Sequence, residues 1–154
     1  KTTVLREIIR TLSNGEGLFR AYQVALADER SELAGMYEGK SSLDVGARTD
    51  VMDSCPKAQA MRMLIRSMAP EVLAADELGT REDIRAVEES LTAGIAVIAT
   101  MHGKSMEDLY NRPGLENIMA KHLFRTIIIL SDNRCKGRVE QIYRWQNGTY
   151  ERVK

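Results

Sequence analysis

The sequence has only two cysteines, Cys55 and Cys135, among 154 residues, and neither lies in a C-x-x-C pair or next to a histidine. This spacing indicates two unpaired thiols in a reducing compartment, rather than a disulfide framework or a zinc site. The chain also has no excess of charge, because 22 lysines and arginines balance 22 aspartates and glutamates. No overall field therefore favours nucleic acid or an anionic membrane, and the composition gives no strong signal for a nucleic-acid partner.

Long apolar runs are missing as well. No stretch approaches the roughly 18 apolar residues that a membrane-spanning helix needs. No signal peptide is visible in the sequence as given, and no repeat, low-complexity tract or coiled-coil heptad occurs. With 44% hydrophobic residues, the chain is long enough for one compact domain, which we expect to span residues 1–154 and to be soluble.

Helical and strand patterns alternate along the chain, which predicts an α/β domain with a mainly parallel sheet. Helical spacing, a capping box at Thr80 and Asp83, and end signals predict helices at 1–14, 57–68, 80–94, 105–110 and 113–123. Continuous apolar runs predict strands at 22–27, 71–76, 95–99 and 126–130, the last of them buried. Residues 31–56 are polar and rich in turn residues, which indicates a long functional loop. Asn147-Gly148 predicts a tight turn between strands at 139–145 and 149–153, a C-terminal antiparallel hairpin over about 138–154.

Acidic residues follow two of the predicted strands. Asp76 and Glu77 end the apolar run at 71–76, and Asp28 and Glu29 end the run at 22–27. Because ligands of parallel α/β sheets gather at the carboxyl ends of the strands, we expect these acids to share one rim of the sheet. For Asp76 and Glu77 the alternative is that the two acids merely begin a solvated loop.

Thr100 and His102 directly follow the strand predicted at 95–99 and therefore belong to the same rim. A single histidine is often a hydrogen-bonded structural group, and for His102 that reading stays open beside a catalytic one.

Lys1-Thr2-Thr3 opens the first predicted helix and matches the second half of a phosphate-binding loop, G-x-x-x-x-G-K-[ST]. The glycines are absent from the sequence as given, so we expect it to be a fragment of a longer chain. In such a site Lys1 neutralises the terminal phosphates, and Thr2 holds Mg²⁺ together with Asp76. Glu77 then acts as the general base on the attacking water, and Thr100 or His102 contacts the γ-phosphate of ATP.

Three arginines are candidates for an arginine finger that a neighbouring subunit donates to this site. Arg48 lies within the polar segment 31–56, and Arg66 shares a helix face with Arg62, one turn away. Arg30 is the third candidate. For Arg48 and Arg66 the alternative is a solvated surface arginine.

Several blocks of the sequence resemble the stage III sporulation protein AA family. They are Lys1-Thr2-Thr3, D-E-R-S-E-L-A-G from Asp28, D-V-G-A-R-T-D-V from Asp44, L-I-R-S-M-A-P-E-V from Leu64 running into Asp76-Glu77, and T-M-H-G from Thr100. The resemblance covers about residues 1–145. It implies an additional-strand P-loop ATPase that is similar to the hexameric motors of type II and type IV secretion.

The resemblance also implies a site. It predicts a RecA-like sheet sandwiched by helices, ATP with Mg²⁺, and a homo-hexamer with the nucleotide between subunits. Lys1, Thr2 and Thr3 fall in the phosphate loop, Asp76 and Glu77 in the Walker B position, Asp28 and Glu29 in the acidic box, and His102 in the histidine box. The family's glycine loop, the strand before it and the N-terminal region are missing here. We therefore expect residues 1–154 alone to bind nucleotide weakly or not at all, which a micromolar ATP affinity would disprove.

The family further implies a role in the mother cell of an endospore-forming bacterium. The protein is expected at the cytoplasmic face of the membrane that faces the forespore, held there by the membrane proteins of a channel. A nucleotide-gated or catalytically idle ring scaffold is the alternative to a motor, although the intact pair Asp76-Glu77 favours the enzyme. A P-loop ATPase that moves nucleic acid is a third possibility, and the neutral net charge counts against it.

Overall fold

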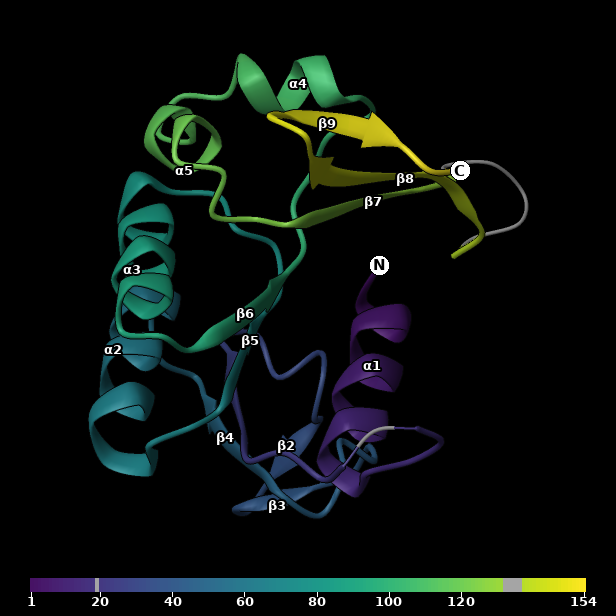
Figure 1. Cartoon of the computed structure of the whole chain (residues 1–154). Helices are drawn as coiled ribbons and strands as arrows, with labels where there is room; N and C mark the ends of the chain where they lie inside the picture. The colour runs from purple at the N-terminus through teal and green to yellow at the C-terminus, as the bar shows by residue number, and fades with distance from the viewer. Residues whose placement is uncertain (19, 132–136) are drawn as a thin grey trace. The chain divides into compact units, whose positions relative to one another are not determined.

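The computed structural model describes residues 1–18, 20–131 and 137–154, and the prediction of an unpaired thiol at Cys135 lies outside these residues. The chain forms two compact units, one of Thr2–His102 and one of Gly103–Lys154 together with Lys1 (Figure 1). We call them the N-terminal and the C-terminal unit. The single domain expected over residues 1–154 stays a prediction.

The N-terminal unit is built on a parallel sheet of four strands in the order β4-β1-β5-β6. The strands are β1 (Val24–Asp28), β4 (Thr49–Asp53), β5 (Val72–Ala75) and β6 (Ala96–Ala99). Every residue of β1 and β5 is buried, as their apolar sequences predict for central strands covered on both faces. The register keeps the strand ends level, because Ala27 pairs with Ala75 and Ala75 with Ala99. The residues after these strands therefore emerge at one edge.

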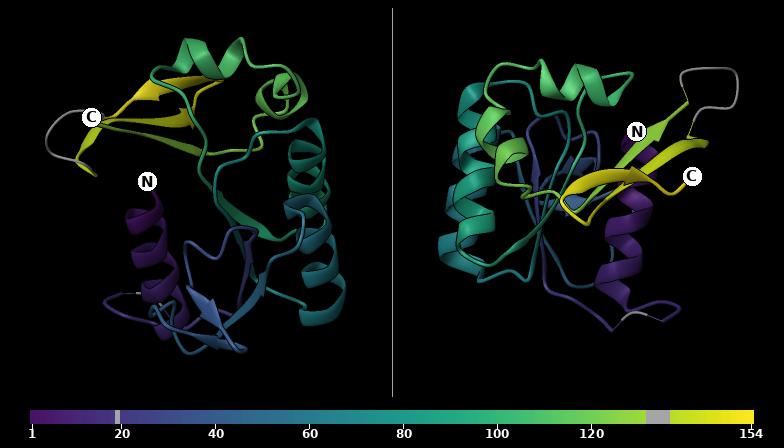
Figure 2. Two further views of the ribbon diagram at one scale, coloured as in Figure 1. Left: turned by 180° about the vertical axis from the view of Figure 1, so that it is seen from behind. Right: turned by 45° about the horizontal axis from the view of Figure 1, so that its top comes forward.

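Helices flank the sheet on both faces, as Figures 1 and 2 show: α1 (Thr2–Asn14) lies on one side, and α2 (Lys57–Met68) with α3 (Arg81–Thr92) on the other. The apolar stripe of α1 buries Leu5 and Ile9 in a core that includes Val24 and Leu26 of β1. The predicted parallel sheet between helices is thus confirmed.

Two helix details test the sequence patterns. The capping box predicted at Thr80 and Asp83 is present and starts α3. The helical spacing of Ala58, Met61, Leu64, Ile65 and Met68 predicts that they form the inward face of α2. This prediction is wrong at Met68, which is 44% exposed, whereas Lys57 is buried. Met68 is the last residue of α2, and Ala69 follows in a left-handed conformation that ends the helix beside solvent.

The interpretation of residues 31–56 as one long loop is wrong. The segment contains a small hairpin of β2 (Met36–Tyr37) and β3 (Lys40–Ser41), and then β4, which pairs with β1 along its whole length. β4 mixes polar and apolar residues and is only half-buried, because it lies at the edge of the sheet. An edge strand needs no continuous apolar run, so its sequence resembles a loop.

The two ends of the sheet differ in chemistry. At the end where the strands begin, the carboxylate of Glu71 accepts hydrogen bonds from the Arg20 guanidinium and from the main-chain N–H of Gln23. The hydrogen bond from Arg20 is the main cause that lowers the pKa of Glu71, and that from Gln23 is second. Arg20 also lies 4.2 Å from the centre of the Tyr22 ring. This ion pair ties the entry of β1 to the entry of β5.

The C-terminal unit holds α4 (Met106–Tyr110), α5 (Glu116–Ala120) and an antiparallel sheet in the order β7-β8-β9. The sheet consists of β7 (Thr126–Leu130), β8 (Val139–Gln146) and β9 (Thr149–Arg152). The predicted hairpin turn is confirmed, since Asn147 and Gly148 have φ values of 51° and 85°. The helix expected at 113–123 is shorter, as α5. β7 was expected to be buried, but Ile128 is 48% exposed, because β7 is an edge strand here.

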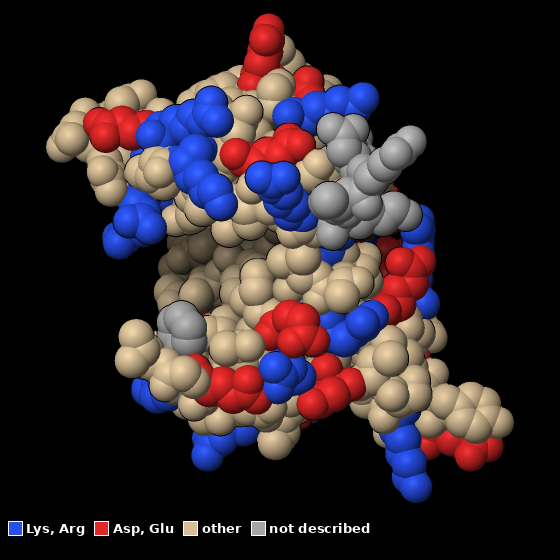
Figure 3. All heavy atoms as spheres, turned by 90° about the vertical axis from the view of Figure 1, so that its right-hand side faces the viewer, with Lys and Arg blue, Asp and Glu red and all other residues tan. Residues whose placement is uncertain are grey.

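Two surface properties complete the description. Over the described residues, the helices are all too short or too polar to cross a membrane. On the side of α1, acidic and basic side chains lie next to one another across the N-terminal unit (Figure 3). The balanced composition is thus visible on that face.

Candidate functional site

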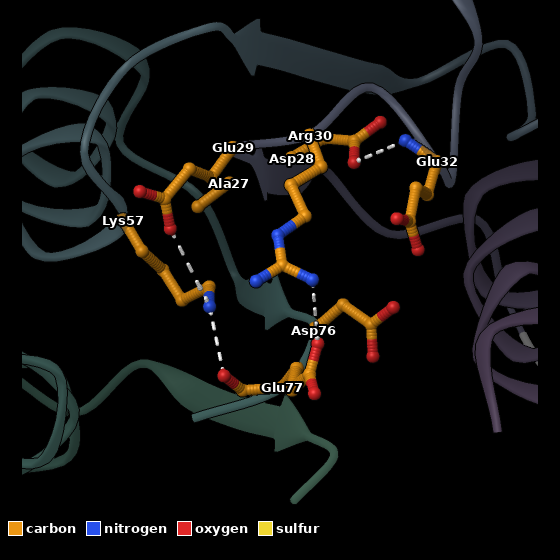
Figure 4. Close-up of a pocket in the computed structure, with 8 residues that line it drawn as sticks. All are labelled: Ala27, Asp28, Glu29, Arg30, Glu32, Lys57, Asp76 and Glu77. Carbon is orange, nitrogen blue, oxygen red and sulfur yellow. Dashed lines mark hydrogen bonds and ion pairs between the residues drawn. The ribbon is translucent and has the colours of Figure 1, made fainter. Parts of the chain in front are cut away.

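A pocket opens at the carboxyl ends of β1 and β5, where the predicted acids emerge (Figure 4). Its lining is almost entirely charged: Ala27, Asp28, Glu29, Arg30, Glu32, Lys57, Asp76 and Glu77. All four acids that the sequence predicted for this rim line the pocket. The shared rim arises because parallel strands in level register end together.

Asp76 is held by two hydroxyl groups. Thr2, the first residue of α1, donates its Oγ1 hydrogen to Oδ2 of Asp76 at 2.9 Å. Thr100, which follows β6, donates to Oδ1 of the same carboxylate. In Figure 4 the carboxylate of Asp76 points toward α1. The structure therefore brings together Thr2, Asp76 and Thr100, which are 74 and 24 residues apart in sequence.

Glu77 has a strained backbone, and its carboxylate contacts Arg30 and His102. Its φ of 53° lies in the left-handed region, which costs a residue other than glycine about 1–3 kcal/mol. Its main-chain N–H donates to Oγ1 of Thr100 at 2.9 Å. Its carboxylate accepts from Arg30 at 3.2 Å and lies 2.6 Å from Nε2 of His102. Glu77 is 40% exposed at its side chain, so its carboxylate meets both solvent and cations.

Asp28 and Glu29 differ in what their carboxylates contact. Asp28 is 2% exposed, and its carboxylate accepts hydrogen bonds from the main-chain N–H groups of Glu32, Leu33 and Ala34 at 2.8–3.2 Å. Glu29 is exposed and lies next to the Lys57 ammonium. A contact of either residue with nucleotide stays a prediction, and for Asp28 the structure shows a role in holding the following loop.

Lys57 is a pocket residue that the sequence patterns did not single out. Its Nζ donates to the main-chain oxygen of Glu77 at 2.9 Å and lies 3.7 Å from Oε2 of Glu29. One signal was available in the sequence. A lysine at the first position of a helix opposes the helix dipole, which favours anions there.

The two main arginine candidates lie away from the pocket of their own chain. The main-chain oxygen of Arg48 accepts from Val24 at the start of β1, the opposite end of the sheet from Asp76. Arg66 lies in the last turn of α2, whose first residue lines the pocket. Both side chains are exposed. Arg30, the third candidate, contacts Glu77 within the same chain.

Lys1 and Thr3 flank Thr2 at the start of α1, and both are exposed. Lys1 belongs to the other compact unit. Their contact with phosphate stays a prediction.

Comparison with known proteins identifies the family. The sequence profile of the family described as "Sporulation stage III, protein AA" matches residues 1–150. This chain belongs to that family. It is 43% identical over 143 residues to Stage III sporulation protein AA of Bacillus subtilis (strain 168). The aligned region covers 93% of this chain and 47% of that protein.

More distant similarity reaches proteins of Porphyra purpurea and Arabidopsis thaliana. This member of the sporulation stage III protein AA family is 28% identical to the uncharacterized protein ycf45 of Porphyra purpurea, over 92% of the chain and 24% of that protein. It is 26% identical to Protein SEEDLING PLASTID DEVELOPMENT 1 of Arabidopsis thaliana, over 75% of the chain and 16% of that protein. The chain therefore spans less than half the length of these curated relatives.

In this family member, the oxygen donors of Thr2 and Asp76 suit a Mg²⁺ site that is completed by water and phosphate. Across the described part of the chain, no three histidine, cysteine, aspartate or glutamate side chains are grouped so that they could hold a metal ion. The Thr2 hydroxyl and the Asp76 carboxylate do offer two adjacent hard oxygen donors. Mg²⁺ typically takes one or two protein oxygens and fills its octahedron with water and substrate phosphates. The pair thus fits Mg²⁺ that arrives with a phosphate ligand.

Proposed function

We propose that residues 1–154 carry the hydrolytic part of a Mg²⁺-dependent ATPase with a RecA-like P-loop fold. The observation that carries this proposal is the contact between Thr2 and Asp76. It joins a hydroxyl at the N-terminus of a helix to an acid at the tip of a buried parallel strand. A helix N-terminus attracts phosphate, and the acid and hydroxyl together can hold the cation that accompanies it.

Each residue of the rim then has a role. Lys1, Thr2 and Thr3 bind the phosphates at the start of α1, and Thr2 with Asp76 holds Mg²⁺. When bound, that cation would supply the positive charge that phosphoryl transfer requires beside the phosphate oxygens. Glu77, next to Asp76, accepts a proton from the attacking water. His102 and Arg30 contact the Glu77 carboxylate and orient it before the nucleotide binds.

The proposal includes assembly. Because Arg48 lies at the opposite end of the sheet from Asp76, it can reach a site of this kind only in a neighbouring copy. The same holds for Arg66, near the far end of α2. This placement supports a homo-oligomer, which we expect to be a hexamer, in which an arginine from one copy completes the site of the next.

The biological role follows from the family name and is likewise proposed. The curated Bacillus subtilis relative is a stage III sporulation protein. We propose that the complete protein works at the cytoplasmic face of the mother-cell membrane toward the forespore, where it energises or assembles a channel. Its partners there would be the membrane proteins of that channel.

The test is steady-state ATP hydrolysis by the protein extended at its N-terminus to the length of the Bacillus subtilis relative. The key variant is Glu77→Gln. The matched control is Glu38→Gln, which makes the same change at an exposed turn between β2 and β3. We expect turnover to rise with protein concentration as copies assemble, and to fall about 10²–10⁴-fold in Glu77→Gln, the range for a lost general base.

Two results would contradict the proposal. One is ATP binding with no turnover that depends on Glu77 at any concentration, which would favour a ring scaffold. The other is equal turnover in the Glu77→Gln and Glu38→Gln proteins, which would place the chemistry elsewhere.

A further inference from the structure

Lys57 occupies a place that is unusual for a lysine. It is the first residue of α2, and its side chain is only 10% exposed. The first turn of α2 has no acidic residue, and the residue before it, Pro56, provides no side-chain cap. The charge of Lys57 is therefore both largely withdrawn from water and opposed by the helix dipole. A cation in this position depends on the partners it finds in the fold.

Those partners come from the tips of two strands. The Lys57 ammonium lies 2.9 Å from the main-chain oxygen of Glu77, within hydrogen-bond distance, and 3.7 Å from Oε2 of Glu29. Figure 4 shows the side chain reaching between them. The closer of the two contacts is thus to the backbone of Glu77 and not to a carboxylate.

This contact completes the support of a strained residue. Glu77 has a φ of 53°, and both of its main-chain polar groups are bound by side chains. Thr100 accepts from its N–H, and Lys57 donates to its carbonyl oxygen. The next residue, Leu78, is fully buried, so the chain turns sharply at Glu77 from the strand tip into the core. That turn presents the Glu77 carboxylate at the pocket, beside Arg30 and His102.

We propose that Lys57 is a positioning residue for Glu77, whose backbone it holds in the conformation that presents the carboxylate in the pocket. This inference rests on the proposed function, in which Glu77 is the general base. A displacement of a reacting group by 1 Å can cost about 10²-fold in rate. Loss of the Lys57 contact therefore lowers the rate of the chemical step. Nucleotide affinity is unchanged, because the proposed phosphate contacts at the start of α1 do not involve Lys57.

The experiment compares three variants of the N-terminally extended protein, namely Lys57→Met, Lys57→Gln and Lys40→Met. Lys57→Met keeps the length of the side chain but cannot donate a hydrogen bond. Lys57→Gln has no charge but carries an N–H that can reach toward a main-chain oxygen. Lys40→Met makes the matched change at an exposed residue of β3. The measurements are kcat and KM for ATP, equilibrium affinity for a non-hydrolysable ATP analogue, and the melting temperature.

We expect kcat to fall about 10²-fold in Lys57→Met, with KM and analogue affinity as in the unmodified protein. Lys57→Gln should retain clearly more kcat than Lys57→Met, because it restores a donor to the Glu77 carbonyl. Lys40→Met should match the unmodified protein in all four measurements. A lower kcat with unchanged KM and analogue affinity is a result that a merely structural lysine would not give.

Glu77→Gln, assayed in parallel, separates the two proposals. If Glu77→Gln abolishes turnover while Lys57→Met keeps full kcat, the ATPase stands and the positioning role is wrong. If Glu77→Gln has no effect, both fall. If kcat falls equally in Lys57→Met and Lys57→Gln, the effect comes from the lost charge beside Glu29 and not from the hydrogen bond to the Glu77 carbonyl. That result would contradict the inference. Joint loss of folding, affinity and kcat in both Lys57 variants, where Lys40→Met stays folded, would make Lys57 a stability residue and also overturn it.

Discussion

Replacing Asp28 by alanine should strongly destabilise the N-terminal unit. The Asp28 carboxylate accepts from three consecutive main-chain N–H groups, and two of these belong to Leu33 and Ala34, which are 0% exposed. Each buried N–H left without an acceptor costs about 1–3 kcal/mol. The N–H of Glu32 can recover a bond to water. The variant should therefore lose about 2–6 kcal/mol of unfolding free energy, the sum for two buried groups.

Urea unfolding followed by far-UV circular dichroism measures this loss, because the helices α1, α2 and α3 dominate the signal. With a typical slope of about 2 kcal/mol per molar, the midpoint should fall by about 1–3 M. The sole tryptophan, Trp145, lies in the C-terminal unit and reports that unit separately by its fluorescence. Asp28→Asn keeps one acceptor oxygen and should lose about half as much.

The matched control is Asp50→Ala. Asp50 lies in the same sheet, and among the described residues its carboxylate accepts one hydrogen bond, from the Gln23 side chain at 2.7 Å. Asp50→Ala should cost about 0.5–1.5 kcal/mol, the usual net value for one bond. If Asp28→Ala costs no more than Asp50→Ala, the loop amides of Leu33 and Ala34 find other acceptors, and the reasoning from their burial is wrong.

Two further predictions concern the fold. Gly46→Ala should cost several kcal/mol, because a Cβ at Gly46 would lie 2.5 Å from the Cβ of Ser13 in addition to the strain of a φ of +90°. Gly148→Ala, with a φ of +85° and open space around it, should cost only the strain, about 1–2 kcal/mol, and equal melting temperatures for both variants would refute the steric argument. The pKa of Glu71 is lowered in the folded protein, first by the hydrogen bond from Arg20. The pair therefore adds stability at pH values above 4.5, the pKa of Glu71 in the unfolded chain, and this stability is lost as the pH falls through the lower pKa of the folded protein. Between about pH 5 and pH 3 the urea midpoint of the unmodified protein should therefore fall more than that of Glu71→Gln, and parallel curves would show that the pair is broken in solution.

The parts of the fold that the sequence predicted are those with strong local signals. β5 is a continuous apolar run that ends in acid, and α3 begins with a capping box, so short stretches of sequence suffice to identify them. β4 was missed because pairing on one side lets a strand keep polar residues. β7 was expected to be buried because three consecutive isoleucines resemble a central strand, although Ile128 is half exposed on an antiparallel edge.

The candidate site was predictable in its membership but not in its geometry. That Asp76 and Glu77 share a rim with Asp28 follows from the topology of a parallel sheet. The left-handed backbone of Glu77 does not follow from any pattern, since its two main-chain supports come from Thr100 and Lys57, 23 and 20 residues away. Lys57 was overlooked for the same reason, because its significance lies in tertiary contacts.

The position of β6 has a practical consequence for handling the protein. Within the described residues β6 ends the sheet and bonds to β5 alone, and its sequence, Ala96-Val97-Ile98-Ala99, has neither charge nor proline. Edge strands of native proteins usually carry such residues, because an uncharged edge can pair with any exposed strand it meets. Concentrated solutions of residues 1–154 alone should therefore self-associate slowly through this edge. A longer polypeptide that supplied a further strand beside β6 would be the more soluble material for experiments.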